Sequence, residues 1–544
     1  KPLGYFASSA LSMRLLGVNE LAARLPAFLS ALLLVAVTAA FARHLFGRRA
    51  AWIAGIAAAA SPLLIAFSRI AIFDSMLSLF VVLALVAFYR AVETFHGPPE
   101  QPSGGRGLGP GSWSSRTWAV VAWLAMVAGV MTKGPVALAL PLLVAAPFAA
   151  WRKAAKAVWR PAGIFAFLGL IVPWITAMEM RVPGFLHYSL MVETFRRVTT
   201  DEMQRTGPLW YFLPYLIGGA FPWSLVAAAG WIERRRETRS RGEAEDPAAR
   251  IPWVFLALWL ALPLILFSLS QSKRPQYILP LIPCLAILAG ASWDRALLPA
   301  RTRPLPGQRA AAVIFLLLGA VFLATAFVPE PWFPRVKAVE GDLVRGTLIG
   351  LAVAGLLGGI LSWRARGWAT ALVALALPTV AFPLVTGPLF GEIAESRSTR
   401  QLAALIERQA SQGRARVAVL DEFPHSLLFY LEQTVDFATR DGAALRNGFV
   451  ERDFERHLSR PETRLHSRSW WKEAVAGCSP KPLFVAPEKY PDVMAEMEAS
   501  PHRRLGSAGA YAVFGPCESG NGDHVAAKEG GSRLTEPRDG GPPS

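Results

Sequence analysis

The sequence predicts an all-α polytopic membrane bundle that carries a small α/β domain at its carboxyl end. Of the 544 residues, 53% are hydrophobic and only 17% are charged, whereas soluble domains have about 25% charged residues. The charges gather in clusters between apolar runs of about 17–26 residues. Runs of that length cross a ~30 Å hydrocarbon core as helices. After about residue 391 the composition becomes polar, which indicates a separate domain.

About twelve membrane spans are predicted in this fragment. They are roughly 21–42, 50–68, 75–92, 118–132, 134–151, 162–180, 210–232, 251–270, 277–293, 310–327, 347–363 and 368–390. The fourth and fifth are separated at 131–135 because Gly134-Pro135 ends a helix and Lys133 requires water. Residues 1–20 are predicted to lie in the interface, anchored by Tyr5 and Phe6.

The distribution of basic residues predicts the orientation. Loops on one side carry 22 Lys and Arg residues, and the other side, including the amino-terminal stretch, carries 14. By the positive-inside rule the richer side is cytoplasmic, so the turn around Asp74 and the carboxyl-terminal region face outward. The net charge of +17 would suggest nucleic acid in a soluble protein. Here membrane topology and anionic lipid head groups account for it, and no nucleic-acid partner is expected.

The predicted domains are a transmembrane region at 1–390, an outer α/β domain at 391–517 and a disordered tail at 518–544. Residues 414–423 and 481–490 read as short buried strands, and 426–433 and 493–500 have helical patterns. The Gly/Pro/Ser-rich segment 93–117 reads as a flexible cytoplasmic loop. Cys478 and Cys517 either form a disulfide in an oxidising compartment or remain free thiols.

A set of charged residues falls on the outer side, where a plain loop does not need them. The set comprises Lys1, Arg69, Asp74, Lys133, Glu193, Arg196, Arg197, Arg205, Lys273 and Arg274. The basic members oppose the topological trend, and an anionic ligand at the outer membrane surface would explain them because Arg and Lys both bind phosphate. For any single member, anchoring to lipid head groups is the simpler explanation.

Asp74 is the candidate catalytic residue. A carboxylate amid this positive charge stays ionised and can accept a proton from a hydroxyl or amine. Together, the base and the cations suit group transfer from a lipid-linked phosphate donor, because the cations stabilise the departing phosphate. The simpler alternative is that Asp74 only caps the helix that follows it.

Other kinds of site are not indicated. The sequence shows no Cys/His metal spacing, P-loop, dinucleotide fingerprint or Ser-His-Asp pattern. His187 lies near Glu193, but one His beside one Glu is weak evidence for a divalent metal. No cofactor is therefore assigned.

Five motifs carry a family resemblance. They are, in order, KPLGYFASSALSMRLLGVNELAARLPAFLSAL, FGRRAAWIAGIAAAASPLLIAFSRIAIFDSML, MTKGPVALALPLL, AFPWS and SKRPQYILPLIPCLAILAG. This series resembles the bacterial branch of the dolichyl-phosphate-mannose protein mannosyltransferase family, which includes the aminoarabinose transferase of lipid A. The resemblance implies a GT-C glycosyltransferase of the bacterial inner membrane. Its donor would be a polyprenyl-phosphate sugar, its acceptor a lipid or a protein, and its active site periplasmic.

The resemblance also implies roles for individual residues. Lys1-Pro2-Leu3 matches a Lys-Pro-Pro-Leu motif, with one Pro absent, whose Lys is associated with the lipid phosphate. Asp74 matches an acidic residue of the outer loop. Glu193, Arg196 and Arg197 match the region that contacts the donor phosphate. Lys273 and Arg274, ahead of Tyr277, match a basic-then-aromatic motif.

Two departures from the family pattern change the expectations. The family begins with another span, whose acidic motif carries the principal catalytic Asp, so this chain is expected to lack that span and to fall short of the family count of about thirteen. Arg205 stands in RTGPLWYF where the family often has a His. A metal associated with that His is therefore in doubt, and Arg205 is expected to neutralise phosphate instead.

Two other functions are compatible with the sequence. One is a transporter or flippase of lipid-linked anions, and the other is a non-catalytic binder of the carrier lipid. A transporter typically has ionisable residues near the midplane and interrupted helices in paired halves. The ionisable residues here gather at one face, which favours the enzyme.

Overall fold

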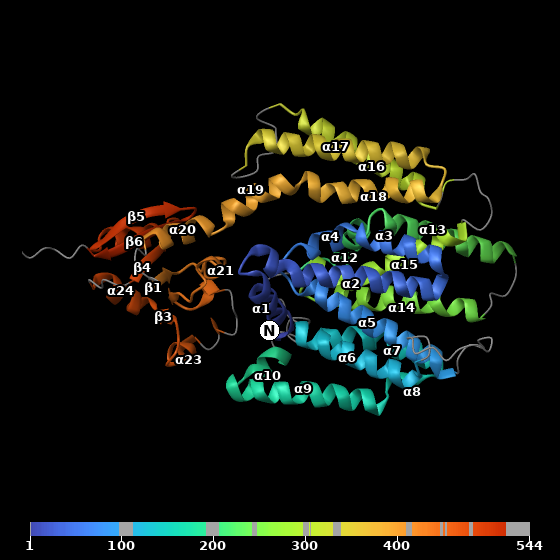
Figure 1. Cartoon of the computed structure of the whole chain (residues 1–544), viewed down its shortest axis with the longest axis horizontal. Helices are drawn as coiled ribbons and strands as arrows, with labels where there is room; N and C mark the ends of the chain where they lie inside the picture. Colours follow the sequence, from blue (N-terminus) through green and yellow to red (C-terminus); the bar gives the residue numbers. More distant parts are fainter. Residues whose placement is uncertain are drawn as a thin grey trace, which may run out of the picture. The chain divides into compact units, whose positions relative to one another are not determined.

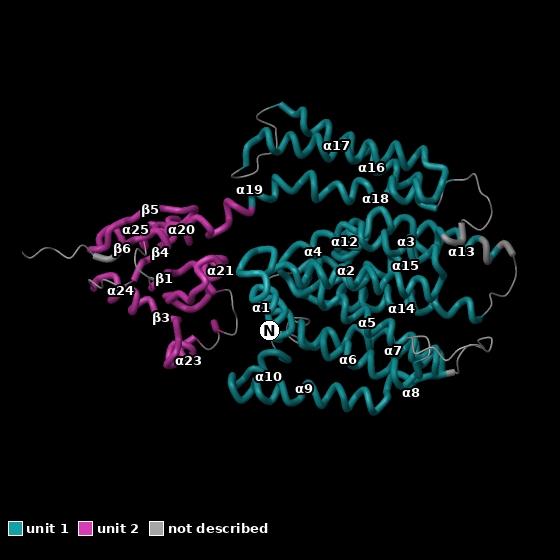
Figure 2. The backbone as a smooth tube through the Cα atoms, in the orientation of Figure 1, with its two compact units in different colours: residues 1–393 teal, residues 394–544 magenta. Residues whose placement is uncertain are grey.

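The structure is a computed structural model. It describes residues 2–96, 113–191, 206–241, 247–296, 304, 306–329, 339–409, 416–445, 450–451, 454–477 and 482–517. The chain divides into two compact units, Lys1–Ile393 and Ala394–Ser544 (Figure 2). Residues 97–112 of the loop predicted at 93–117, and the predicted tail at 518–544, lie outside the described residues. The ends of the predicted loop are helical, since α5 reaches Glu93, a 3₁₀ helix covers Thr94–His96 and α6 begins at Ser115.

The first unit is a bundle of helices (Figure 1). Its first half contains α1 (Gly4–Leu16), α2 (Glu20–Phe46), α3 (Arg48–Ala59), α4 (Pro62–Ser68), α5 (Asp74–Glu93), α6 (Ser115–Lys133), α7 (Val136–Trp151), α8 (Ala155–Val158), α9 (Pro161–Arg181) and α10 (Phe185–His187). Its second half contains α12 (Phe212–Gly219), α13 (Trp223–Arg241), α14 (Pro247–Leu269), the 3₁₀ helix η4 (Pro275–Leu281), α15 (Ile282–Ala296), α16 (Gln308–Ala326), α17 (Gly341–Arg364), α18 (Trp368–Val385) and α19 (Gly387–Arg397).

The helices confirm the predicted fold class, but the count of spans is lower than predicted. Within the described residues, nine helices are long and apolar enough to cross a membrane, or up to eleven if the bent pairs α3/α4 and α12/α13 each count as one. The remaining predicted span, 134–151, is α7, which has 16 residues. At 1.5 Å per residue it measures about 24 Å, short of the ~30 Å hydrocarbon core. Apolar composition alone does not reveal this shortfall.

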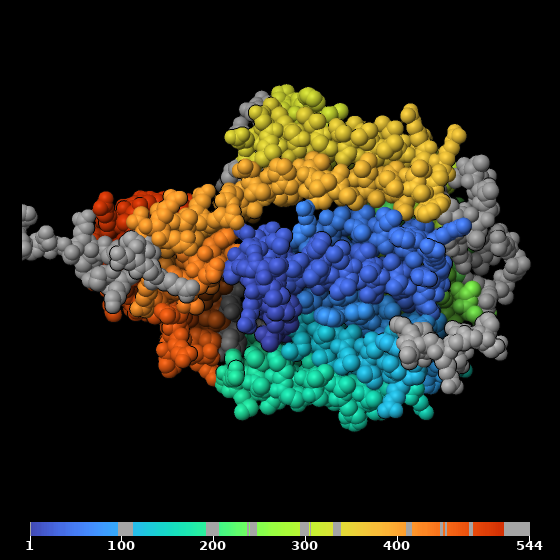
Figure 3. Space-filling model, in the orientation of Figure 1, coloured from blue at the N-terminus to red at the C-terminus, as the bar shows by residue number. Residues whose placement is uncertain are grey.

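Helix α5 lies at the centre of the bundle and α9 at its periphery. In the most apolar window of α5, 78% of the residues are buried, compared with 17% for the window that contains α9. Small residues permit close packing around the centre: a Cβ on Gly290 of α15 would lie 2.6 Å from the Ala50 carbonyl of α3. Close backbone contacts between small residues are typical of helices that pack against one another in a membrane. Figure 3 shows a hollow that separates α18 from the main bundle on the face drawn.

The second unit is an α/β domain, as predicted. Its sheet contains β1 (Arg416–Leu420), β2 (Asp436–Thr439), β3 (Leu465–Ser467), β4 (Pro482–Pro487), β5 (His502–Ala508) and β6 (Tyr511–Cys517) in the order β3-β2-β1-β4-β6-β5. The first four are parallel, and β6 is antiparallel to β4 and β5. The other elements are α20 (Arg400–Gln409), α21 (Leu427–Leu431), η5 (Ala443–Leu445), α23 (Phe454–Leu458), α24 (Arg468–Ala476) and α25 (Pro491–Glu498).

Alternating side chains of β1 build the cores on both faces of this sheet. Val417 and Val419 pack with residues of α20 and α21, whereas Ala418 and Leu420 pack with residues of α24 and α25. The strands predicted at 414–423 and 481–490 are thus confirmed as β1 and β4, and the two helical patterns as α21 and α25. Cys478 lies outside the described residues, so its pairing stays a prediction.

A buried carboxylate in β2 makes this unit sensitive to acid. Asp436 is 1% exposed and accepts hydrogen bonds from Arg416, Arg464 and His466. Burial alone would raise its pKa, but the hydrogen bonds from His466 and Arg416 outweigh burial and hold the pKa well below its usual range. The ionised form therefore favours folding at every pH above the ordinary Asp value of about 3.9.

We expect the stability that Asp436 provides to disappear as the pH falls below about 3.9 and through its lowered folded pKa. Asp436→Asn should cost about 1–3 kcal/mol at neutral pH, because it removes hydrogen bonds to a charged group. Hydrogen exchange of the β1 and β2 amides as a function of pH measures both effects. Glu462→Gln, at an exposed position, is the control and should behave as the wild type. Equal acid sensitivity in Asp436→Asn and the wild type would contradict the assignment.

Candidate active site

Asp74 is the first residue of α5, and its side chain is buried. The residue is 1% exposed, and its Oδ1 forms an ion pair with Lys133 Nζ at a distance of 2.5 Å. The N-cap of α5 is Phe73, with no side-chain cap, so Asp74 is not the helix cap that the simpler interpretation required. Oδ2 is also buried and has no hydrogen-bond partner among the described residues. Asp74 therefore keeps one oxygen on Lys133 and has a second available as an acceptor.

Lys133 is the last residue of α6. Its side chain is 14% exposed, and its Nζ lies 5.3 Å from the ring centroid of Phe73 and 5.0 Å from that of Tyr277. Gly134 follows at φ +98°, a backbone conformation that glycine adopts without strain, and ends the helix there. An acidic residue at the start of α5 and a basic one at the end of α6 also match the helix dipoles.

The second basic pair, Lys273 and Arg274, follows α14. Lys273 is 6% exposed, and its Nζ donates to the carbonyl oxygens of Ser268 at 2.8 Å and Ser270 at 2.7 Å. Burial lowers the pKa of Lys273. Arg274 precedes η4 and lies near Tyr211.

Tyr277 links the two basic regions. Besides its contact with Lys133, its ring lies 6.4 Å from that of Phe212 and 5.7 Å from that of Phe267. These rings belong to α12 and α14, so η4 holds Lys133 and the Lys273 segment at the same end of the bundle. Gly207 also packs here, because a Cβ on it would lie 3.2 Å from Lys273 Cδ.

The amino-terminal segment packs on the Lys133 side of this cluster. A Cβ on Gly4 would lie 2.8 Å from the carbonyl oxygen of Met131, two residues before Lys133. Tyr5 is 4% exposed, and its ring lies 6.3 Å from that of Phe73. The segment that follows Lys1 therefore abuts the Asp74–Lys133 pair, while Lys1 itself lies outside the described residues.

The other predicted residues are not joined to this cluster by described contacts. Arg69 is exposed and donates instead to the Pro383 carbonyl oxygen in α18 at 3.5 Å. The remaining four, Glu193, Arg196, Arg197 and Arg205, lie outside the described residues. The described residues contain no group of three or more His, Cys, Asp or Glu side chains that could hold a metal ion.

Sequence reasoning missed Gly4, Tyr5 and Phe73 as parts of the site. It also missed the pairing of Asp74 with Lys133. A signal for the pairing was present, since α5 and α6 are consecutive spans, so that the start of one and the end of the other lie at the same membrane face. The aromatic Phe73, directly before Asp74, was a weaker signal because apolar residues are abundant throughout.

The comparisons with known proteins agree with this architecture. Residues 1–189 match the family described as dolichyl-phosphate-mannose-protein mannosyltransferase. A crystal structure of ArnT from Cupriavidus metallidurans bound to undecaprenyl phosphate matches with a TM-score of 0.72 at 23% identity, over 94% of this chain and 87% of that one. The amino-terminal part of the chain is therefore similar to this family. The structural match shows that the chain has the ArnT fold.

Two curated relatives indicate how far the sequence similarity extends. An undecaprenyl phosphate-alpha-4-amino-4-deoxy-L-arabinose arabinosyl transferase of Pseudomonas fluorescens is 34% identical over 222 residues, which are 39% of this chain and 38% of the relative. A transferase of the same name from Pseudomonas aeruginosa is 29% identical over 386 residues, 69% of this chain and 63% of the relative. The chain thus spans about 38% to 63% of the length of these relatives.

Proposed function

We propose that this chain is a membrane glycosyltransferase. It transfers a sugar from a polyprenyl-phosphate-linked donor to a lipid acceptor of the lipid A type or to a protein. The observation that carries the proposal is the buried Asp74–Lys133 pair, which lies at the same end of the bundle as Lys273 and Arg274. The names of the two relatives, both undecaprenyl phosphate-linked arabinosyl transferases, support the donor class. The resemblance to the family that includes the aminoarabinose transferase of lipid A favours a lipid A acceptor.

Asp74 is the proposed base. Its Oδ2 accepts the proton as the acceptor oxygen forms a bond to the anomeric carbon of the sugar. The bond from that carbon to the phosphate oxygen breaks, and the electron pair leaves with the polyprenyl phosphate. Lys133 fixes the orientation of the Asp74 carboxylate through the 2.5 Å ion pair.

Lys273 and Arg274 are the proposed phosphate-binding residues in the described part of the chain. Two of the three N–H donors of Lys273 are used by Ser268 and Ser270, which leaves one donor and the full charge for a phosphate oxygen. Arg274 adds a guanidinium that can bind two phosphate oxygens at once. Lys1, Arg69, Glu193, Arg196, Arg197 and Arg205 remain predicted members of the donor site. No metal is part of the proposal.

The location is also a proposal. The apolar helices make the chain an integral membrane protein, and the family indicates the bacterial inner membrane. The excess of basic residues in the opposite loops supports a periplasmic Asp74. Residues 391–517 would then form a periplasmic domain.

Transfer in proteoliposomes tests the proposal directly. The full chain is reconstituted with an undecaprenyl-phosphate aminoarabinose donor and lipid A, and sugar-labelled product is measured together with released undecaprenyl phosphate. Stoichiometric formation of both is expected. Donor binding without product would instead indicate a non-catalytic binder. Movement of the intact donor between leaflets without product would indicate a flippase.

The packing of α1 on α6 gives a further prediction. In Gly4→Ala the new Cβ would lie 2.8 Å from the Met131 carbonyl oxygen, and a backbone atom cannot move aside as a side chain can. The end of α6, and Lys133 with it, should shift. Because a misplacement of about 1 Å can cost about a hundredfold in rate, we expect kcat to fall by up to that factor.

The matched control for this prediction is Gly169→Ala in α9. A Cβ at Gly169 meets nothing within 4 Å, so this variant should transfer sugar at the wild-type rate. Wild-type transfer by Gly4→Ala would show that α1 does not position the Asp74–Lys133 pair.

A further inference from the structure

A cluster of exposed arginines and tryptophans lies where α17 ends and where α16 and α18 begin. Its members, which we call the α16–α18 patch, are Arg309, Trp363, Arg364, Arg366 and Trp368. The opposite end of α18 lies beside the turn that leads to Asp74, because Arg69 of that turn donates to the Pro383 carbonyl oxygen. Helix α18 has 18 residues, so its two ends are about 27 Å apart. The patch is therefore remote from the candidate active site, and the proposed transfer reaction does not use it.

One buried side chain fixes the geometry of the patch. Gln308 is 1% exposed, and its amide nitrogen donates to the carbonyl oxygens of Ser362 at 2.7 Å and Ala365 at 2.9 Å. These bonds join the first turn of α16 to the end of α17, where carbonyl groups lack partners within the helix. The next residue, Arg309, is thereby held over the Trp363 ring, with its Cζ 5.5 Å from the ring centroid. The patch is thus preorganised.

The arginines of the patch are not neutralised by acidic residues of their own helices. No hydrogen bond or ion pair joins Arg309, Arg364 or Arg366 to any described residue. Helices α16 and α18 contain no Asp or Glu, and α17 contains one acidic residue, Asp342, in its first turn. Asp342 lies about 33 Å along the helix from Arg364. Three guanidinium groups are therefore available to a ligand at this end of α16–α18.

The neighbouring sequence is also basic. The stretches 294–309 and 364–368 together contain six arginines and one acidic residue, Asp294. Helix α3, which packs on α18, begins with Arg48 and Arg49. The connections around the patch therefore add positive charge to it.

The acidic residues that follow α13 lie away from the patch. Helix α13 approaches α16 at its start, where a Cβ on Gly307 would lie 2.8 Å from the Leu225 carbonyl oxygen. From Leu225 the helix continues for about 24 Å to its end at Arg241, before the acidic segment 242–246 begins. Residues 232–250 as a whole contain six arginines and five acidic residues. A net positive charge thus remains at the patch even when this segment is counted.

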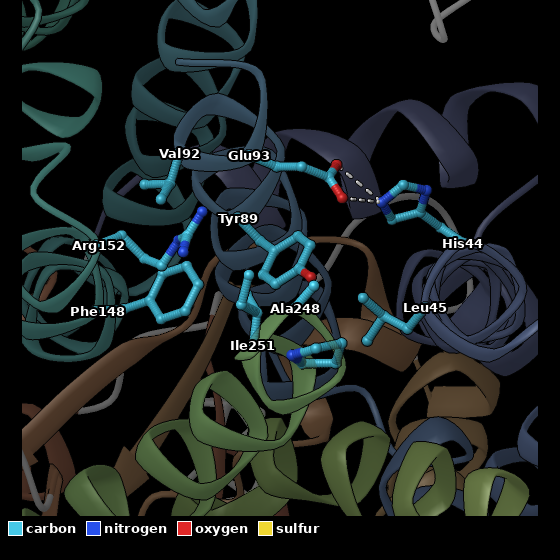
Figure 4. Close-up of a pocket in the computed structure, with 10 residues that line it drawn as sticks. His44, Leu45, Tyr89, Val92, Glu93, Phe148, Arg152, Ala248 and Ile251 are labelled. Carbon is cyan, nitrogen blue, oxygen red and sulfur yellow. Dashed lines mark hydrogen bonds and ion pairs between the residues drawn. The ribbon is translucent and has the colours of Figure 1, made fainter. Parts of the chain in front are cut away.

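Charged side chains at the same end of the main bundle are paired instead. Figure 4 shows Glu93, at the end of α5, bonded to His44 of α2. Glu93 also accepts a hydrogen bond from Arg90 Nη1 at 2.8 Å. The cavity of about 370 Å³ that His44 and Glu93 line therefore has this ion pair in its wall. The α16–α18 patch differs because its arginines have no such carboxylate among the described residues.

The apolar side chains around the patch indicate that its partner is a lipid. Trp363 is 52% exposed and Trp368 is 37% exposed, and tryptophan is enriched where a membrane meets water. Exposed aliphatic side chains continue from the patch along α16 and α17, namely Val313, Leu317, Ile360 and Leu361. A phospholipid has an anionic head group followed by apolar chains, in the same order. A soluble anion would leave the apolar side chains uncovered.

We propose that the α16–α18 patch binds the head group of an anionic phospholipid of the bilayer. Arg309, Arg364 and Arg366 pair with the phosphate, and the amino ends of α16 and α18 add positive helix-dipole potential. The rings of Trp363 and Trp368 lie beside the glycerol region of the lipid. This site is separate from the donor site at Asp74 and does not depend on the proposed function.

Native mass spectrometry of the full chain in detergent tests the proposal. Phosphatidylglycerol is the probe, and phosphatidylcholine, whose head group carries no net charge, is the comparison. We expect phosphatidylglycerol to bind more tightly than phosphatidylcholine. Arg364→Gln should weaken phosphatidylglycerol binding about fivefold, the usual effect of one basic residue at an anionic membrane surface. The triple variant Arg309→Gln, Arg364→Gln, Arg366→Gln should weaken it about a hundredfold.

The matched control is Arg116→Gln, which removes an exposed arginine from the first turn of α6 at the same end of the bundle. It should bind phosphatidylglycerol as the wild type does. Unchanged affinity in the triple variant, or a fivefold loss in Arg116→Gln, would overturn the proposal. Displacement of phosphatidylglycerol by inorganic phosphate at an equal concentration would overturn the assignment to a lipid, because the patch would then take the free anion.

Discussion

Lys133→Ala should lose about 3–5 kcal/mol of stability, and adding Asp74→Asn should restore stability without restoring transfer. The Asp74 side chain is 2% exposed and its described partner is Lys133. Removing that partner leaves an uncompensated buried carboxylate, and breaking a buried pair in this way costs about 3–5 kcal/mol. Asparagine carries no charge, so the double variant does not bury an uncompensated carboxylate and should be as stable as the wild type. It still lacks a base at position 74, so it should not transfer sugar.

Thermal unfolding in detergent and transfer in proteoliposomes together measure this prediction. The matched control is Lys156→Ala, which removes an exposed lysine of the same unit and should change neither stability nor transfer. Transfer by the stable double variant would exclude Asp74 as the base. Equal stability of Lys133→Ala and the wild type would exclude the buried ion pair.

The second large effect is expected at Lys273. Lys273→Met should lower transfer about 10²–10³-fold, the usual loss when one donor to a developing negative charge is removed. The pH dependence gives a sharper test. Because burial lowers the pKa of Lys273, wild-type transfer should decline at a pH below the ordinary lysine value of about 10.4. Lys273→Arg keeps its charge at that pH, so its decline should shift to higher pH.

Deprotonation of Lys273 does not itself unfold the protein, so loss of folded protein through this residue would not produce the same decline in transfer at alkaline pH. Between the lowered folded pKa of Lys273 and the ordinary value, the unfolded chain binds more protons than the folded one, so this residue makes the free energy of unfolding rise with pH. The rate of transfer by Lys273→Arg is compared with the wild type from pH 7 upward. If the rate of transfer falls by half at the same alkaline pH in both proteins, Lys273 is not part of the phosphate site.

The sequence predicted most of the membrane helices for a simple reason. An apolar run long enough to span hydrocarbon must satisfy its backbone hydrogen bonds within a helix, whatever its neighbours are. Each predicted span therefore corresponds to a helix or a bent pair of helices. The bends of 57° in α3/α4 and 96° in α12/α13 escaped prediction, because hydropathy reports length and composition but not direction.

The strands of the second unit were predicted in part. β1 and β4 have buried apolar sequences and lie in the middle of the sheet. The shorter strands β2 and β3 have too few residues to show a strand pattern in the sequence and are recognised from their pairing with adjacent strands. In addition, β2 carries Asp436, a residue type that is unfavourable in strands. Its charge is tolerated only because Arg416, Arg464 and His466 meet it in space, and that meeting is a tertiary effect.

For the candidate site, the sequence by itself determined which charged residues oppose the topological trend. Asp74, Lys133, Lys273 and Arg274 stood out because charge at the rim of a membrane span requires water or a partner. The tertiary structure alone decided which of them meet. It pairs Asp74 with Lys133, 59 positions away, and directs Arg69 to α18 instead. Helix packing sets these contacts, and it depends on the shapes of many small side chains at once rather than on any local pattern.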